Sequence, residues 1–195
     1  MRRVAWWFAV IAPVLCPAAD ELTIATYNIE NYVAADRMTG QGYRKDYPKP
    51  EVAKAALRVV IKQLDADVLV LQEMGPVPYL TELQRDLERQ GTPYPYAVLM
   101  RGADEDRHSA VLSSRPFART AQHSGLVFKY REGHEAVKRG LLEVVLDTAS
   151  GPVTLWALHL KSRYTDEAAD PASAERRAGE AMAIREFILK QTGET

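Results

Sequence analysis

The residues Val68–Leu71, within the stretch DADVLVLQEM, constrain the fold more than any other part of the sequence. This run is continuously apolar, which is typical of a strand whose two faces are both buried. Such a strand needs a packed layer on each side. Apolar residues at helical spacing occur before it, over Glu51–Leu64, and after it, over Pro76–Gln90. The sequence therefore predicts a layered α/β domain, with sheets packed on each other and helices outside.

The other predicted elements are mostly short. Thr23–Tyr27 alternates like a strand, whereas residues 33–50 contain four Gly and Pro breakers and predict a loop. The apolar stripe expected on the first helix consists of Val52, Ala56, Val59, Val60 and Leu64, and that on the second of Leu80, Leu83 and Leu87. Further strands are predicted over Tyr96–Met100, Ser109–Ser113, Gly125–Tyr130, Leu141–Asp147 and Val153–Leu160, and a last helix over Pro171–Gln191.

The N-terminus has the layout of a secretory signal peptide. A basic start is followed by the apolar run Val4–Leu15, which is too short to span a bilayer, and then by the small residues Ala18 and Ala19. We expect residues 1–19 to be a signal peptide and residues 20–195 to form the mature domain. An uncleaved membrane anchor is the alternative. Cleavage implies export, to the periplasm or out of the cell, with no stable membrane association afterwards.

Cleavage would also change the composition. The one cysteine, Cys16, lies inside the predicted signal, so disulfides and thiolate metal sites are excluded from the mature domain. Loss of Arg2 and Arg3 leaves 23 basic residues against 26 acidic ones, which moves the formal charge from -1 to -3. A net acidic protein is not a general polyanion binder, so any basic surface must be local.

Three predicted strands have an apolar body and a polar carboxyl end. The first ends on Asn28, the second on Gln72 and Glu73, and the last on His159, followed by Lys161. If the strands are neighbours in one sheet, these ends meet along one edge. A carboxylate suits Mg²⁺, an amide orients a phosphate or a metal-bound water, and an imidazole donates to phosphate or transfers a proton. The set indicates a divalent metal and a phosphate.

Each of these residues also has an ordinary structural interpretation. Asn28 could simply end a strand, because asparagine favours turns. Glu73 could be a solvated strand end, and His159 a partly buried histidine without chemistry. Glu30 and Asn31 are expected to start the loop over the edge and are less strongly indicated for chemistry. The coincidence of three complementary strand ends favours the functional interpretation.

Four stretches in order, TYNIENY, DADVLVLQEM, RGLLEVVL and WALHLKSR, resemble the endonuclease/exonuclease/phosphatase superfamily, the DNase I-like fold, in its secreted bacterial form. The resemblance covers the chain from Glu21 to about Gln191. It implies a four-layer α/β sandwich, in which two packed mixed β-sheets are flanked by helices. It also implies hydrolysis of phosphoester bonds by in-line attack of water on phosphorus, with Mg²⁺, or Mn²⁺ or Ca²⁺, as cofactor.

The resemblance assigns roles to particular residues. Asn28 matches the active-site asparagine of the first block, Glu73 the metal-binding glutamate, and His159 the histidine that contacts the scissile phosphate and protonates the leaving group. Asn28 and Glu73 are thus the expected metal site. Lys161 and Ser162 lie beside His159 as expected phosphate-binding residues.

Two further positions follow from the same resemblance. Arg139 opens the RGLLEV block and is an expected substrate contact. Asp106 and Arg107 occupy the place of an Asp-x-Arg block that precedes a strand, and are expected to belong to the site. The usual Arg-Gly of that block is here Arg107-His108, which is a departure from the family.

The family's last two blocks, of Gly-Asp-x-Asn and Ser-Asp-His type, do not occur in residues 160–195. The fold is therefore expected to be incomplete at the C-terminus, with an unpaired sheet edge. A fragment or frameshifted copy of a full enzyme, an inactive relative, or completion by a partner chain would each explain this. The activity of this chain is in doubt, because catalytic groups that act as a unit fail together.

Three functions are considered. The first is a secreted Mg²⁺-dependent nuclease with nucleic acid as substrate, which fits the eight basic against five acidic residues over 101–139. The second is a phospholipid or small-molecule phosphodiesterase, for which Tyr32, Tyr43 and Tyr47 are faint support. The third is a non-catalytic protein that binds phosphate or nucleic acid.

Overall fold

The computed structural model describes residues 21–194, and its first sheet has four strands. The strand order is β1 (Ile24–Tyr32), β4 (Val68–Met74), β6 (His108–Ser113) and β5 (Tyr96–Leu99). β1 runs parallel to β4, whereas β6 is antiparallel to both β4 and β5. The sheet is therefore mixed, and the carboxyl ends of β1 and β4 lie at the same edge.

A second sheet packs against the first. It consists of β11 (Gly151–Leu158), β10 (Leu141–Thr148) and β7 (Arg119–His123), and it is antiparallel throughout. One core cluster joins Val70 and Val111 of the first sheet to Leu142 and Val144 of the second. All of its pairings are antiparallel, whereas the family resemblance implied that both sheets are mixed.

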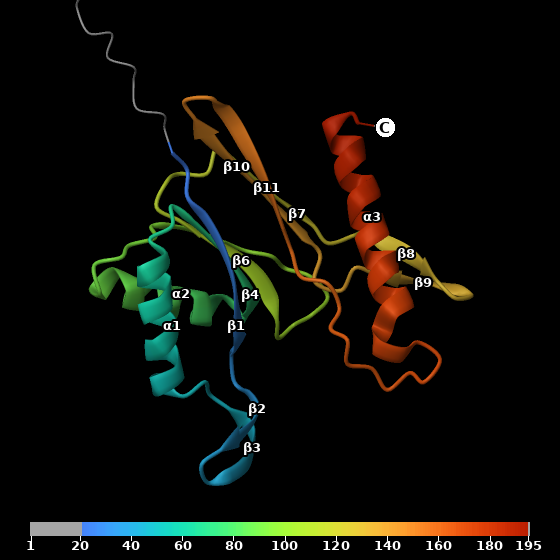
Figure 1. The fold of residues 1–195 in the computed structure, drawn as a ribbon, viewed down its shortest axis with the longest axis horizontal. Coiled ribbons are helices and arrows are strands. Elements are labelled where there is room, and N and C mark those ends of the chain that lie inside the picture. Colours follow the sequence, from blue (N-terminus) through green and yellow to red (C-terminus); the bar gives the residue numbers. More distant parts are fainter. Residues whose placement is uncertain (1–20, 195) are drawn as a thin grey trace, which may run out of the picture.

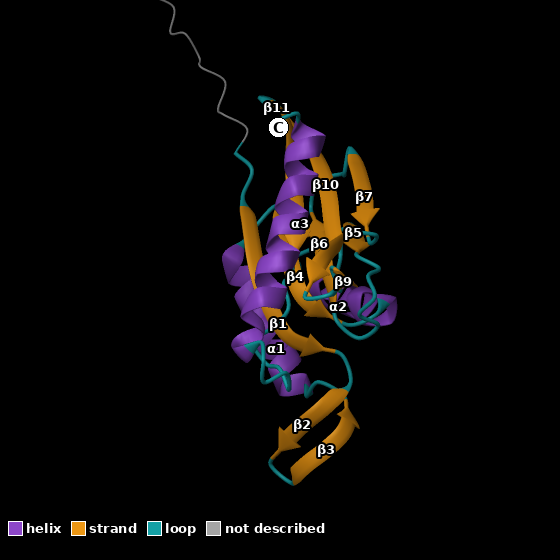
Figure 2. Cartoon of the chain, turned by 90° about the vertical axis from the view of Figure 1, so that its right-hand side faces the viewer, coloured by secondary structure: helices purple, strands orange, loops and turns teal. Residues whose placement is uncertain are grey.

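The helices form the two outer layers (Figures 1 and 2). α1 (Glu51–Leu64) and α2 (Val77–Arg89) cover the free face of the first sheet, and α3 (Ala174–Thr192) lies on the side of the second sheet after a short 3₁₀ turn, Pro171–Ser173. The order helix, sheet, sheet, helix confirms the predicted four-layer DNase I-like sandwich.

Strand β4 explains why the sequence constrains the fold so strongly. Leu69 and Leu71 belong to the core cluster under α1 and α2, whereas Val68 and Val70 belong to the cluster between the sheets. All four are at most 9% exposed. Because successive side chains point to opposite faces, a fully apolar run places this strand at the centre of the layers.

The prediction for α1 gives the right bounds but the wrong inner face. Leu57, Arg58 and Ile61 are the buried residues, whereas Val52 and Val59 are exposed. Arg58 enters the interior because Glu51 accepts a hydrogen bond from it at 2.5 Å and Asp86 of α2 accepts another at 3.1 Å. A buried charge is tolerated when it is paired in this way. The three leucines predicted for α2 are all buried.

Two hairpins extend from the layers. Residues 33–50, predicted as loop, contain β2 (Ala35–Thr39) and β3 (Gly42–Tyr47), and this hairpin projects away from the rest of the molecule (Figure 2). The second hairpin, β8 (Val127–Tyr130) with β9 (Gly133–Ala136), packs under α3. Strands β7 and β9 were missed, because their sequences, RTAQH and GHEA, have no apolar face.

The predicted signal peptide over residues 1–19, including Cys16, lies outside the described residues and remains a prediction. Within residues 21–194, none of the helices has the length and apolar character needed to cross a membrane.

Candidate functional site at the carboxyl ends of β1, β4 and β11

The parallel pairing of β1 with β4 brings Asn28 next to Glu73. The register places Asn28 opposite Gln72, one residue before the glutamate. The side-chain amide of Asn28 donates to Glu73 Oε1 at 3.1 Å, and its oxygen accepts the N–H of Glu30 at 2.9 Å. Two of the three predicted catalytic residues are therefore in direct contact.

The backbone is strained where these strands end. Glu30, Asn31 and Glu73 have φ angles of 50°, 50° and 63°, in the left-handed region. The strand pairing also shifts register between Asn28 and Tyr32. A non-glycine residue in this region costs about 1–2 kcal/mol, and such residues collect where function requires a particular geometry. Lys49, itself buried, donates to the carbonyl oxygen of Glu30 at 2.8 Å and holds the bend in place.

Asn31 connects three parts of the site. Its N–H donates to Glu73 Oε2 at 3.0 Å, and its side-chain oxygen accepts the Nε–H of Arg107 at 2.7 Å. Its carbonyl oxygen accepts a hydrogen bond from Arg37 of the β2–β3 hairpin. From the sequence, Asn31 was less strongly indicated for chemistry than Asn28. The one sequence property that fits its place here is that asparagine tolerates the left-handed conformation better than most residues.

His159 reaches the same edge from the other sheet. It directly follows β11, and its Nε2 lies 3.9 Å from Glu73 Oε1. The expectation that all three strand ends neighbour one another in one sheet is therefore wrong: they meet because the two sheets face each other. Burial lowers the pKa of His159, and the charges of Arg139 and Arg107 lower it further, against the opposing effect of Glu73. The ring Nδ1 is buried and has no hydrogen-bond partner in the described part of the chain.

Asp104, which the sequence did not indicate, holds Arg107 and Arg139 in position. Its Oδ2 lies 3.3 Å from Arg139 Nε, and its Oδ1 accepts the N–H groups of Arg107 at 3.2 Å and Asp106 at 3.3 Å. Asp104 is 5% exposed, whereas the predicted Asp106 is exposed and contributes only its backbone here. Gly102 permits this approach, because a Cβ there would lie 2.8 Å from the carbonyl oxygen of Lys138.

Lys161 and Ser162 lie beyond His159 but face each other. Lys161 Nζ donates to the carbonyl and hydroxyl oxygens of Ser162, each at 3.3 Å, and to the carbonyl oxygen of Tyr164 at 2.5 Å. Burial lowers the pKa of Lys161, and Arg176 and Arg139 lower it further. Neither Lys161 nor Ser162 forms a hydrogen bond or ion pair with Asn28, Glu73 or His159. We call Asn28, Glu73, Arg107, Arg139 and His159 the Glu73 site.

The Glu73 site offers a single carboxylate to a metal ion. No group of three or more His, Cys, Asp or Glu side chains with metal-binding geometry occurs within residues 21–194. Each oxygen of Glu73 accepts one hydrogen bond and keeps a free lone pair. Mg²⁺ typically binds through one or two carboxylates, water and substrate phosphate, so Glu73 fits such an ion. Asn28 as placed directs its N–H₂ group toward Glu73 and its oxygen toward Glu30.

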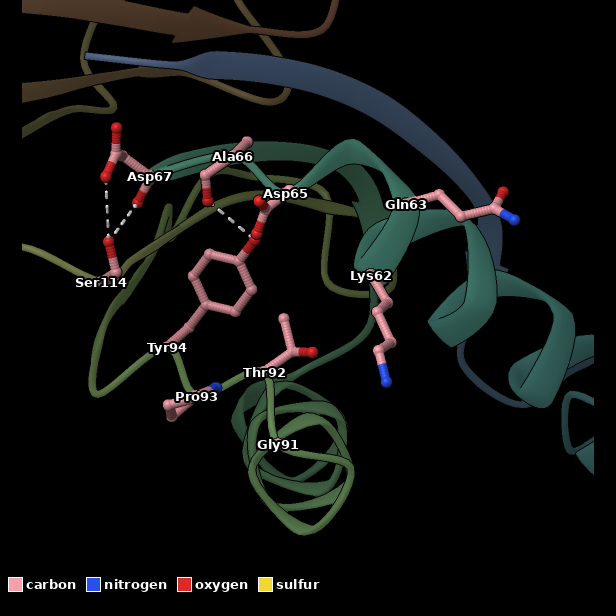
Figure 3. Close-up of a pocket in the computed structure, with 10 residues that line it drawn as sticks. All are labelled: Lys62, Gln63, Asp65, Ala66, Asp67, Gly91, Thr92, Pro93, Tyr94 and Ser114. Carbon is pink, nitrogen blue, oxygen red and sulfur yellow. Dashed lines mark hydrogen bonds between the residues drawn. The ribbon is translucent and has the colours of Figure 1, made fainter. Parts of the chain in front are cut away.

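A hollow lies at the opposite end of the first sheet, and Figure 3 shows the residues that line it. It encloses about 670 Å³ between the end of α1, the loop after α2 and the start of β4, with Asp67, Tyr94 and Ser114 among its lining. Three of its polar side chains, those of Asp67, Tyr94 and Ser114, are already hydrogen-bonded. Tyr94 donates to the carbonyl oxygen of Ala66 at 2.9 Å, and Asp67 accepts from Arg115 at 3.2 Å. We call it the Tyr94 hollow; it contains no predicted site residue.

Comparison with known proteins agrees with this architecture. The Endonuclease/Exonuclease/phosphatase family matches residues 25–191. Sphingomyelinase C from Streptomyces griseocarneus superposes with a TM-score of 0.57 at 20% identity, over 88% of this chain and 59% of that one. For SmcL the values are 0.55 and 19%, over 87% and 58%. An endonuclease/exonuclease/phosphatase family protein from Leptotrichia buccalis C-1013-b gives 0.52 and 11%, over 85% and 61%.

At these identities the structural likeness establishes the fold alone. The chain spans about three fifths of the length of these structures. No curated protein sequence matches it.

Proposed function

The chain belongs to the endonuclease/exonuclease/phosphatase family, and from this premise we propose that it is a divalent-metal-dependent phosphodiester hydrolase acting on nucleic acid. The family includes nucleases, phosphatases and sphingomyelinases, its members are mostly hydrolases, and they typically depend on a divalent metal. Mg²⁺ is the proposed ion. Export through the first 19 residues is part of the proposal, since a secreted enzyme would meet free nucleic acid.

The observation that supports hydrolysis best is the setting of Glu73. A half-buried carboxylate, held by N–H groups of Asn28 and Asn31, lies 3.9 Å from an imidazole. Two guanidinium groups, of Arg107 and Arg139, are close enough to lower the pKa of that imidazole. A carboxylate, an imidazole and two cations at one edge can hold a phosphoryl group from several sides.

The lowered pKa of His159 defines what its ring can do. A lowered pKa favours the uncharged imidazole, which carries one N–H and one free nitrogen. We assign the proton to Nε2, because Nδ1 is buried without a donor or acceptor. His159 then donates Nε2–H to a non-bridging oxygen of the phosphate, while Arg107 and Arg139 stabilise the negative charge that develops there. A divalent cation at Glu73 would neutralise charge on the phosphoryl and leaving oxygens.

Nucleic acid is the favoured substrate because the segment that carries Arg107 and Arg139 is basic. Residues 101–139 contain eight Lys or Arg against five Asp or Glu, in a chain whose net charge is -1. Such local positive charge suits a phosphate backbone. A lipid phosphodiester is the second candidate, because a sphingomyelinase C shares the fold. A protein that binds phosphate without cleaving it is the third, because the described site offers a metal ion a single carboxylate.

The test is hydrolysis by the purified chain with Mg²⁺ or Mn²⁺. Plasmid DNA, RNA, sphingomyelin vesicles and bis-p-nitrophenyl phosphate serve as substrates, and Glu73→Ala as the control. We expect metal-dependent cleavage of nucleic acid that Glu73→Ala abolishes. Hydrolysis of sphingomyelin alone would show that the substrate is a lipid and not nucleic acid. Binding without turnover would support the non-catalytic alternative.

A further inference from the structure

A second polar hollow adjoins the Glu73 site. It encloses about 370 Å³, within the usual range of ligand pockets of about 300–1,000 Å³. Its lining comes from four separate segments: the loop before β6, the β9 region, the segment after β11 and α3. We call it the Lys138 hollow; its lining residues are Ala103, Glu135, Ala136, Lys138, Lys161, Arg176 and Glu180.

Three segments that line this hollow continue into the Glu73 site or into Asp104, which pairs with Arg139 of that site. Ala103 precedes Asp104, Lys138 precedes Arg139, and Lys161 follows His159 by two positions. Consecutive Cα atoms are 3.8 Å apart, and two residues span at most about 7 Å. The charge of Arg139 is also close enough to lower the pKa of Lys161, so a ligand group in the hollow lies near one at the Glu73 site. A chain molecule with repeated charged groups can occupy both places.

A buried carboxylate fixes the walls. Glu180 of α3 is 3% exposed, and its two oxygens accept the backbone N–H of Lys161 at 2.6 Å and of Lys138 at 3.4 Å. The carbonyl oxygen of Lys138 in turn accepts the N–H groups of Ala103 at 2.9 Å and Asp104 at 3.1 Å. Burying a carboxylate is costly unless it is hydrogen-bonded. Glu180 therefore acts on the backbone and sets the spacing of the lysines.

Two ammonium groups in the Lys138 hollow are not paired with a carboxylate of the described chain and can bind an anion. Lys138 is exposed, and its ammonium group has no partner within residues 21–194. The ammonium group of Lys161 donates only to neutral oxygens, of Ser162 and Tyr164. Arg176 is paired with Glu135, at 2.7 and 2.9 Å. Three cations thus face two carboxylates, one of which is occupied with backbone amides.

We propose that the Lys138 hollow binds the phosphate next to the one held at the Glu73 site, so that the protein grips a nucleic-acid strand at two successive phosphodiesters. This rests on the proposed phosphodiesterase function and specifies its substrate as a polymer. A phosphocholine-type headgroup suits the hollow poorly, because its second charged group is a quaternary ammonium ion. Such ions are bound by aromatic cages, whereas Lys138 and Lys161 would repel one.

The test compares Lys138→Ala with Lys62→Ala. Lys62 is an exposed lysine at the end of α1, on the rim of the distant Tyr94 hollow, so it is a matched loss of charge. The probes are a fluorescent thymidine oligonucleotide of about twelve residues, which is within the usual site sizes, thymidine dinucleotide with one phosphodiester, bis-p-nitrophenyl phosphate and sphingomyelin vesicles.

Lys138→Ala is expected to weaken oligonucleotide binding about tenfold at low salt. It should also reduce the slope of log K against log salt by about 0.7, because one phosphate contact is lost. The dinucleotide, the small ester and Lys62→Ala should show no change. An equal effect of both variants, no effect of Lys138→Ala, or an effect on the vesicles instead would overturn the proposal.

The two proposals can fail separately. If Lys138→Ala and Lys62→Ala bind the oligonucleotide equally well while the protein cleaves bis-p-nitrophenyl phosphate, the second phosphate site is rejected and the hydrolase proposal is retained. Absence of all cleavage rejects the hydrolase, while the binding and salt measurements still decide whether Lys138 contacts a phosphate.

Discussion

The Glu73 site and the Tyr94 hollow lie at opposite ends of the same sheet and differ in how their polar groups are used. In the Tyr94 hollow, Asp67 is bound by Arg115 and by the N–H of Thr23, and Tyr94 by Ala66. At the Glu73 site, by contrast, one nitrogen of His159 is unpartnered within residues 21–194 and Glu73 keeps free lone pairs. Asp67 and Tyr94 in the Tyr94 hollow are therefore already bonded, whereas His159 and Glu73 keep unused hydrogen-bonding capacity.

The two ends of the sheet also differ in where left-handed residues occur. Both ends of the sheet contain a left-handed residue, since Asp65 beside the Tyr94 hollow has a φ of 43°. Asp65, however, caps the end of α1, where such a conformation is ordinary. Glu30, Asn31 and Glu73 lie within strands, where it is unusual. Left-handed residues near the ends of the paired strands β1 and β4, together with unused hydrogen-bonding capacity, therefore point to the Glu73 site rather than to the Tyr94 hollow.

Replacing a carboxylate at each end is the strongest test of this comparison. Glu73→Gln should lower kcat on bis-p-nitrophenyl phosphate at least about 100-fold, because a metal-assisted reaction loses several kcal/mol of stabilisation. Asp67→Asn should leave kcat within about twofold and lower the free energy of unfolding by about 1–3 kcal/mol. Steady-state kinetics and urea unfolding measure both. Equal losses of kcat in the two variants would contradict the comparison.

A pair of arginines gives the next largest effect. Arg107→Ala should raise KM about tenfold, because a charged hydrogen bond to phosphate contributes about 1.5–3 kcal/mol. Arg115→Ala removes one partner of Asp67 and should leave KM unchanged, while the free energy of unfolding falls by about 1 kcal/mol. The result to look for is a crossed pattern, with affinity changed by one arginine and stability by the other. A KM effect of Arg115→Ala would show that the far end takes part in binding.

Tyr94→Phe isolates a single hydrogen bond of the Tyr94 hollow. The hydroxyl donates to the carbonyl oxygen of Ala66, and both residues are buried. Its loss should lower the free energy of unfolding by about 1 kcal/mol without changing kcat or KM. Tyr164→Phe, at a residue that is 76% exposed, is the control and should change neither. Reduced hydrolysis by Tyr94→Phe would mean that this hollow serves the reaction.

The smallest expected effect is a change in the free energy of unfolding at alkaline pH, caused by ionisation of Tyr94. Burial raises the pKa of Tyr94 above its usual value, and the charges of Asp65 and Asp67 raise it further. Its stabilising contribution is therefore complete below the unfolded pKa of about 10 and is lost as the pH rises through the folded value. As the pH rises above about 10, the unfolding free energy of the wild type should fall more steeply than that of Tyr94→Phe. Parallel curves would refute this.

The fold was predictable where apolar residues alone decide the structure. The run at β4 determines the central strand, and the leucines of α2 determine its inner face. The prediction failed on α1, where the buried Arg58 depends on partners in Glu51 and Asp86. It also failed on the β2–β3 hairpin, whose strands are mostly exposed and therefore carry no apolar alternation. Burial that depends on a distant partner leaves no local signal.

The candidate site divides in the same way. Asn28, Glu73 and His159 could be named because each ends an apolar strand, and the structure brings them together. Asp104 and Asn31 could not, because their roles arise from contacts across the fold, with Arg139 at 3.3 Å and Arg107 at 2.7 Å. Strand ends can be recognised in a sequence, whereas residues that orient other side chains depend on tertiary contacts.

The β2–β3 hairpin acquires a role from the bonds of Asn31. Arg37 of the hairpin donates to the carbonyl oxygens of Asn31 and Val33, and the N–H of Asn31 donates to Glu73. The exposed hairpin is thus joined mechanically to the carboxylate through one guanidinium group and one peptide unit. A molecule that binds the hairpin and draws Arg37 away would release Asn31 and loosen Glu73, so that a contact made far out on the surface would adjust the geometry of the site.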